Sequence, residues 1–166
     1  MGLVLAAVGA WVAALLEVTI ASRFQFAGAQ LQILLVFGIV LTLVSSFESG
    51  ITWAFFGGLS ADMLGMRPLG STVFALLITV GAASLIGRLL SSARPLDVVI
   101  SVIVLAPFYL MLVDMTTALL SPPAPTLRVA DLFSAALVNT VLGALTTAAL
   151  YIVRRRFERG EKRTVW

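Results

Sequence analysis

Apolar runs of about 15 to 25 residues recur along the whole chain, and this feature restricts the fold more than any other. A helix needs about 20 apolar residues to cross the hydrocarbon core of a bilayer. The runs are continuously apolar, as in 132–153, whereas strands of a membrane barrel alternate polar and apolar residues. In lipid a helix also satisfies its own backbone hydrogen bonds. The sequence therefore predicts an all-α integral membrane protein.

The positions of the runs predict about six transmembrane helices, of which the second and third are short. Together these two cover about 34 residues, which is too long for one crossing, and Glu48, Ser49 and Gly50 between them are typical of a turn. A re-entrant third segment is the alternative. We expect a transmembrane domain over 1–153 and a basic cytoplasmic tail over 154–166. The expected spans are 2–22, 31–47, 51–64, 71–86, 96–120 and 132–153.

The composition agrees with a bilayer as the main solvent and excludes several kinds of chemistry. Only 11% of the residues are charged, against about 25% in soluble domains. The chain has no cysteine and no histidine, which excludes thiolate nucleophiles, disulfides and imidazole metal ligands. We therefore expect no catalytic residue, metal or cofactor.

The basic residues predict the orientation of the chain in its membrane. Six of the eleven lie in the tail, where they favour contact with anionic lipid headgroups and not with nucleic acid. With six spans, the tail shares its side with Arg88 and Arg94, while three arginines lie on the other side. By the positive-inside rule both termini are cytoplasmic. The outer arginines are Arg23, Arg67 and Arg128.

Two acidic side chains lie inside predicted spans, where an ionisable group needs a partner or a wet cavity. Glu17 and Asp114 fall at similar depth near the outer ends of the first and fifth spans, and Asp62 and Arg67 lie near the same face. One interpretation is that these groups reach the headgroups or pair with nearby arginines. The other is an outward polar site that receives a charged residue of a partner.

Small residues follow two of the spans at a spacing that lets another helix approach closely. Ala6, Ala10 and Ala14 recur every four positions on the first span, and Gly57 and Gly58 lie on the third. Packing within the chain's own bundle and contact with a partner helix are both compatible with this pattern.

The stretch 53–70 (WAFFGGLSADMLGMRPLG) carries the most specific motif. Gly58, Leu59 and Asp62 precede a loop that closes on Leu69 and Gly70. This arrangement resembles the central signature of the rod shape-determining protein MreD family.

The resemblance implies a non-enzymatic scaffold subunit of the bacterial cell-wall elongation complex in the inner membrane. The implied partner is the single-span protein MreC, with MreB, RodA and the transpeptidase that accompanies RodA further away. Gly57, Gly58, Asp62 and Arg67 are then candidate partner-binding residues, together with Glu17, Asp114 and the alanine stripe.

A second function class stays open. The MreD family is similar in fold to the six-helix, substrate-binding S-components of energy-coupling-factor vitamin transporters, in which small residues of the first helix dock the transport partner. Ala6, Ala10 and Ala14 resemble that arrangement. The short outward loops of this chain offer few groups to bind a vitamin. An intramembrane enzyme is the third class, but no nucleophile or metal set accompanies the three acids.

Overall fold

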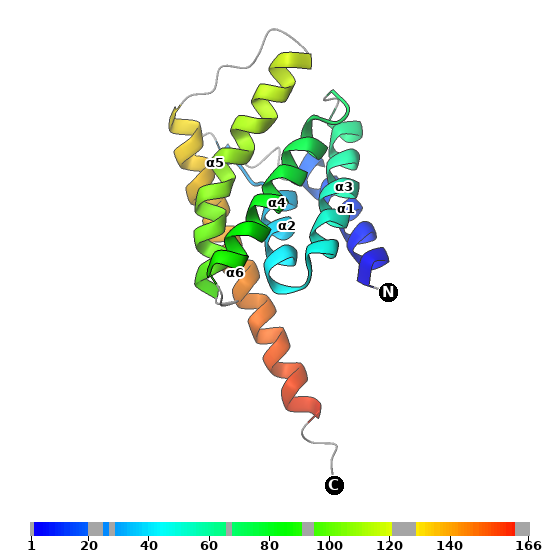
Figure 1. Cartoon of the computed structure of the whole chain (residues 1–166), viewed down its shortest axis with the longest axis vertical. Coiled ribbons are helices and arrows are strands. Elements are labelled where there is room, and N and C mark those ends of the chain that lie inside the picture. The colour runs from blue at the N-terminus through cyan, green and yellow to red at the C-terminus, as the bar shows by residue number, and fades with distance from the viewer. Residues whose placement is uncertain are drawn as a thin grey trace.

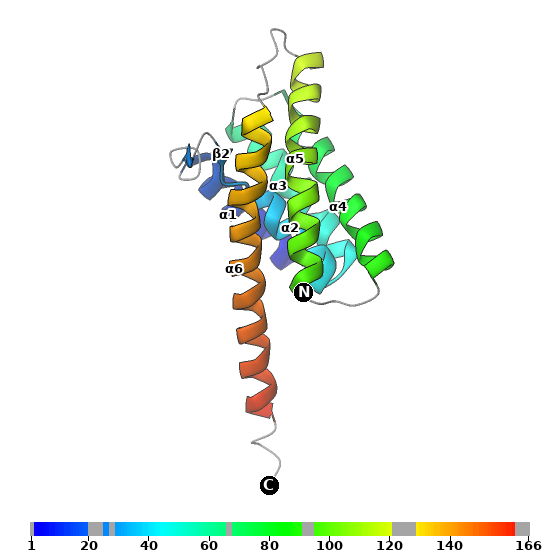
Figure 2. The ribbon, with the colours of Figure 1, turned by 90° about the vertical axis from the view of Figure 1, so that its left-hand side faces the viewer.

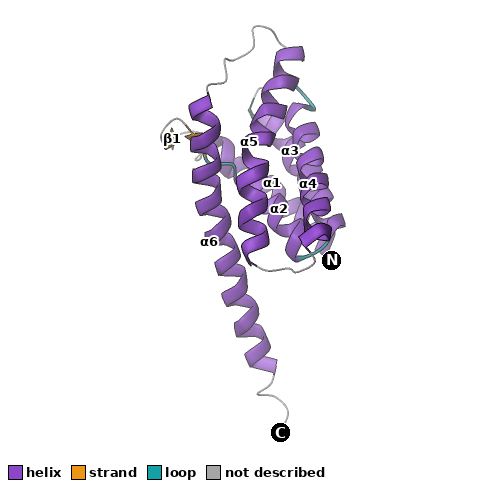
Figure 3. Cartoon of the chain, turned by 60° about the vertical axis from the view of Figure 1, so that its left-hand side comes forward, coloured by secondary structure: helices purple, strands orange, loops and turns teal. Residues whose placement is uncertain are grey.

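The computed structural model describes residues 2–19, 25–26, 29–65, 68–90, 95–120 and 129–161. These form six helices and one antiparallel ladder, in which β1 (Gln25–Phe26) pairs with β2 (Ala29–Gln30). The prediction of an all-α membrane-type fold is confirmed (Figure 3). The helices are α1 (Gly2–Thr19), α2 (Ile33–Val44), α3 (Phe47–Leu64), α4 (Ser71–Leu90), α5 (Pro95–Leu120) and α6 (Val129–Glu161).

The six helices form one bundle in which successive helices alternate in direction (Figure 1). The start of α1 and the C-terminal part of α6 lie at the same end of this bundle, as an even number of antiparallel helices requires. The final turns of α6 extend beyond the other helices (Figure 2). We call the end that holds the α1 start the near end, and the opposite end, which holds the α3–α4 connection, the far end.

Four helices in the described part of the chain are long and apolar enough to cross a membrane. These are α1, α4, α5 and α6, and in α6 the apolar window is Val129–Ala149. Their exposed large apolar side chains would mostly face lipid. Lipid is the normal solvent for such surfaces in a bilayer. The chain is therefore a membrane-embedded protein.

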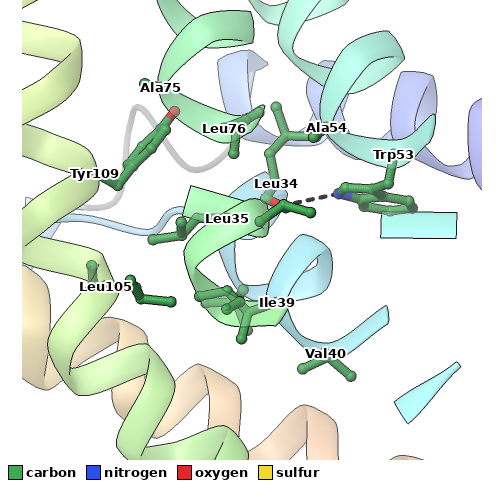
Figure 4. Close-up of a cluster of buried hydrophobic side chains, with 14 of the residues drawn as sticks. Leu34, Leu35, Ile39, Val40, Trp53, Ala54, Ala75, Leu76, Leu105 and Tyr109 are labelled. Carbon is green, nitrogen blue, oxygen red and sulfur yellow. Dashed lines mark hydrogen bonds between the residues drawn. The ribbon is translucent and has the colours of Figure 1, made fainter. Parts of the chain in front are cut away.

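The short helix α2 is the centre of the bundle. Its 12 residues correspond to about 18 Å at ~1.5 Å per residue, well short of a hydrocarbon core of about 30 Å. It contacts all five other helices, and half of its residues are buried, as expected for a helix enclosed by protein. The buried residues of α2 are Leu34, Leu35, Val36, Gly38, Ile39 and Val40. Figure 4 labels four of them: Leu34, Leu35, Ile39 and Val40.

Three predicted boundaries were wrong. The turn between α2 and α3 lies at Ser45 and Ser46, because the Ser46 hydroxyl accepts a hydrogen bond from the Ser49 N–H at 3.3 Å and caps α3. Glu48 therefore lies in the first turn of α3, where an acidic side chain interacts favourably with the helix dipole. Arg88 lies in the last turn of α4 and not in the following connection.

The sixth helix also differs from its prediction. Its backbone does not end at the triple arginine but stays helical to Glu161. Arginine is a good helix former, so leaving the apolar layer does not require the helix to end. The predicted division at residue 153 thus marks a change of composition and not a break in the backbone.

Candidate functional site

The acidic residue predicted on the first span holds the start of the second helix. Glu17 lies two residues before the end of α1, and its Oε2 accepts a hydrogen bond of 2.7 Å from the backbone N–H of Leu34. Leu34 is the second residue of α2. The first N–H groups of a helix have no partner within that helix, so this carboxylate supplies one.

Asp62 does the same for α4. It lies two residues before the end of α3 and is 1% exposed. Its carboxylate accepts hydrogen bonds from the Gly70 N–H at 2.8 Å, the Ser71 hydroxyl at 3.2 Å and the Thr72 N–H at 3.0 Å. Thr72 is the second residue of α4. Both oxygens of Asp62 are therefore used inside the chain.

The two carboxylates occupy equivalent positions relative to the helices that they join. In each, a carboxylate two residues before the end of one helix accepts the N–H of the second residue of the next helix. A negative charge at this position also interacts favourably with the dipole of the helix that it caps. Both acids therefore stabilise helix starts of their own chain, and the outward polar site that receives a partner stays a prediction.

A second polar contact at the start of α2 was missed by the sequence reasoning. The Gln32 N–H donates to Asn139 Oδ1 at 2.8 Å, and Asn139 Nδ2 donates to Gln32 Oε1 at 3.2 Å. Asn139 is fully buried and is the central residue of the apolar window Val129–Ala149. An amide in the middle of an apolar span is the signal that could have found this contact.

The position of Asn139 also places α2 along the bundle. Because Asn139 lies at the centre of the apolar window of α6, its partner Gln32 places the start of α2 level with the middle of that window. Among apolar side chains water cannot satisfy the free N–H groups. Glu17 and Asn139 together supply acceptors for two of them. This explains physically why two polar side chains lie inside apolar spans.

The tryptophan of α3 ties that helix to the start of α2. Its indole Nε1 donates to the Leu34 carbonyl oxygen at 2.9 Å (Figure 4). Its ring stacks on Phe37 with 5.6 Å between centroids. A Cβ on Gly9 would lie 3.1 Å from the Trp53 ring, so the glycine makes room for it.

The small residues singled out in the sequence are used for packing within the bundle. Ala10 and Ala14 are fully buried and Ala6 nearly so, and α1 packs chiefly against α3. A Cβ on Gly57 would lie 2.7 Å from Leu34 Cδ2 and 3.4 Å from Ala10 Cβ. Of the two interpretations of the stripes, internal packing is therefore the one that the structure bears out.

The motif of 58–70 forms one unit at the connection of α3 and α4. A Cβ on Gly58 would lie 2.7 Å from the Val73 Cα, so only glycine lets the two backbones approach this closely. Gly70 has a φ of +96°, a conformation that L side chains rarely adopt. Leu59 is half-buried, whereas Leu69 is 68% exposed at the tip.

The remaining candidate residues lie apart from these caps. Asp114 is half-buried on α5 and is itself engaged in a polar interaction. Arg67, Arg23 and Arg128 lie outside the described residues, so their predicted roles stay predictions. Within the described ranges, no three acidic side chains come together as a metal site would require.

Together, the fold and the capped helix starts define a helical membrane protein organised around an enclosed half-length helix. The chain matches no protein-family model, no curated protein and no solved structure. Any assignment of function therefore rests on the residues of this chain.

Proposed function

We propose that the chain is a non-enzymatic membrane scaffold of the MreD type, which acts in the bacterial cell-wall elongation complex. In this proposal it lies in the inner membrane with both termini in the cytoplasm. It binds the single-span protein MreC directly, while MreB, RodA and the transpeptidase partner of RodA join through the assembly. The basic tail contacts anionic headgroups, no nucleic acid is bound, and no bond is made or broken.

The observation that supports this proposal is that residues of the 58–70 motif act together at the connection between α3 and α4. Three of the five residues that carry the resemblance have a defined task at one connection: Gly58 permits close helix contact, Asp62 caps α4, and Gly70 adopts the left-handed conformation. The motif is thus a structural device that fixes α3 against α4. Since no family match accompanies it, the proposal rests on these residues.

A second observation favours a scaffold over the vitamin-transporter alternative. In S-components the small residues of the first helix dock the transport partner, which requires them to be accessible. Here Ala10 and Ala14 are fully buried, and the helix packed most extensively on α1 is α3. A transport partner could reach this stripe only by displacing α3.

The mechanism is assembly on a rigid bundle. The carboxylates of Glu17 and Asp62 and the amide of Asn139 are bonded internally, so they fix α1 and α6 to the start of α2 and α3 to the start of α4. Partners would then bind the lipid-facing surfaces of the helices, where most side chains are apolar. In a bilayer such contacts depend on close packing and on hydrogen bonds between helices.

The test is depletion of the chain in its native host, together with co-purification from native membranes. We expect depletion to convert rod-shaped cells to spheres, and the tagged chain to retain MreC. Re-expression of the wild-type chain is the control and should restore the rods. Recovery of ATPase subunits or a bound vitamin, with unchanged cell shape, would refute the scaffold.

A further inference from the structure

The apolar surface that the bundle presents to lipid is shorter on one side than on the other. Around the enclosed α2, the outer helices follow in the order α1, α3, α4, α5 and α6, each packed on the next (Figure 1). On each helix this surface extends from the first to the last exposed large apolar side chain. Its length decides how thick a hydrocarbon layer the helix matches.

The short side consists of α1, α3 and α4. On α1 the exposed large apolar side chains run from Leu3 to Leu16, and Glu17 follows as an ionisable group. The apolar surface is about 20 Å long on α1, about 22 Å on α4 and about 26 Å on α3, at ~1.5 Å per residue. The limits on the other two helices are Phe74 and Leu89 on α4, and Phe47 and Leu64 on α3.

The long side consists of α5 and α6. Exposed large apolar side chains run from Leu96 to Leu120 on α5 and from Val129 to Ile152 on α6. These stretches correspond to about 36 Å and about 35 Å, against a hydrocarbon core of about 30 Å. A long surface can match the core by tilting, but tilt makes a short surface reach even less far. The bilayer must therefore thin where it meets a short surface.

Two polar contacts place the missing length of α1 toward the far end. Glu17 accepts the N–H of Leu34, and Asn139 is bonded to Gln32, two residues before Leu34. The end of α1 thus lies near the level of Asn139. From there α6 extends ten residues to its start at the far end, which is about 15 Å. Phe133 on this stretch is 75% exposed, so the apolar surface of α6 continues beyond the end of α1.

We propose that the chain thins the bilayer locally along α1, in the leaflet at the far end, and that this side favours lipids with short acyl chains. Along α5 and α6 the bilayer keeps its full thickness, because both helices reach across it. The occupant of the short side is the bilayer itself. The proposal requires only that the chain is embedded in a membrane, so it is independent of the scaffold function.

The test is quenching of tryptophan fluorescence by brominated lipids. The full-length chain is placed in vesicles that mix dimyristoleoyl- and dierucoyl-phosphatidylcholine, with bromine first on the short-chain lipid and then on the long-chain lipid. Trp11 is 56% exposed on α1 and reports on the short side, whereas Trp53 is buried. Trp166→Phe removes the third tryptophan of the chain.

The matched control moves the reporter to the long side. In the same background, Trp11→Phe with Phe108→Trp places the indole on α5, at a residue that is 40% exposed. At Trp11 we expect the short-chain lipid to bind about twofold to fivefold more strongly than the long-chain lipid, because each ångström of mismatch has a modest cost. At position 108 we expect no preference for the short-chain lipid.

Three results would overturn the proposal. Equal binding of the two lipids at Trp11 would show that α1 does not select for thickness. The same short-chain preference at both positions would show that the effect is not confined to the short side. An absence of quenching at Trp11 by either lipid would show that protein covers α1. If the control variant does not fold, Met111→Trp, at a residue of α5 that is 55% exposed, replaces Phe108→Trp.

Discussion

Replacing Asp62 by alanine should destabilise the bundle, because it removes the buried carboxylate that caps α4. The variant removes the acceptor of two backbone N–H groups, those of Gly70 and Thr72, at a residue that is 1% exposed. A buried donor left without its partner costs about 1 to 3 kcal/mol, and loss of an N-cap alone costs about 0.5 to 2 kcal/mol. We expect the free energy of unfolding to fall by about 2 to 4 kcal/mol.

The assay is thermal unfolding of the purified protein in detergent, followed by tryptophan fluorescence. For a chain of this size 1 kcal/mol corresponds to about 2 to 4 °C, so Tm should fall by roughly 5 to 15 °C. Asp62→Asn retains one acceptor oxygen but places an NH₂ group near a backbone donor, so we expect an intermediate shift.

Met63→Ala is the control for this prediction. It changes the next residue of α3, whose side chain is 69% exposed. Its Tm should stay within about 2 °C of wild type, as is usual for substitutions away from special contacts. If Asp62→Ala behaves like Met63→Ala, the capping role of the carboxylate is refuted.

Two further substitutions test the packing and the buried amide. Gly58→Ala places a Cβ 2.7 Å from the Val73 Cα and should lower the free energy of unfolding by about 1 to 3 kcal/mol. A Cβ at Gly81 meets nothing within 4 Å, so the control Gly81→Ala should raise it by about 0.5 to 1 kcal/mol. Equal Tm values for the two variants would contradict the close approach of α3 and α4. Asn139→Leu leaves the buried Gln32 N–H without its acceptor and should cost about 1 to 3 kcal/mol, and an unchanged Tm would show that this contact does not hold α2.

The sequence predicts much of the fold because bilayer thickness sets the length of an apolar helix. Five of the six predicted spans coincide with helices to within four residues at each end. The α3 start and the α6 end were misplaced, since Ser46 caps α3 and arginines continue α6. Composition marks where the apolar layer ends, but only local capping determines where a helix begins.

The candidate site was predicted less well, for a physical reason. The sequence correctly singles out Glu17, Asp62 and Gly58 as unusual residues, because acids in apolar spans and glycines in helices each require an explanation. It does not say what they contact. Asn139 and Gln32 are 107 positions apart, and only the packing of α6 on α2 brings them together.

Cysteine labelling in intact membranes tests the central claim, that α2 is a half-length helix whose start is held at membrane depth. The chain has no native cysteine, so single variants at Ile33, Ser45 and Leu69 report on the α2 start, the near end and the far end. With a membrane-impermeant maleimide, we predict that Leu69→Cys and Ser45→Cys react from opposite sides and that Ile33→Cys reacts from neither. Rapid labelling of Ile33→Cys from the side of Leu69→Cys would contradict the claim.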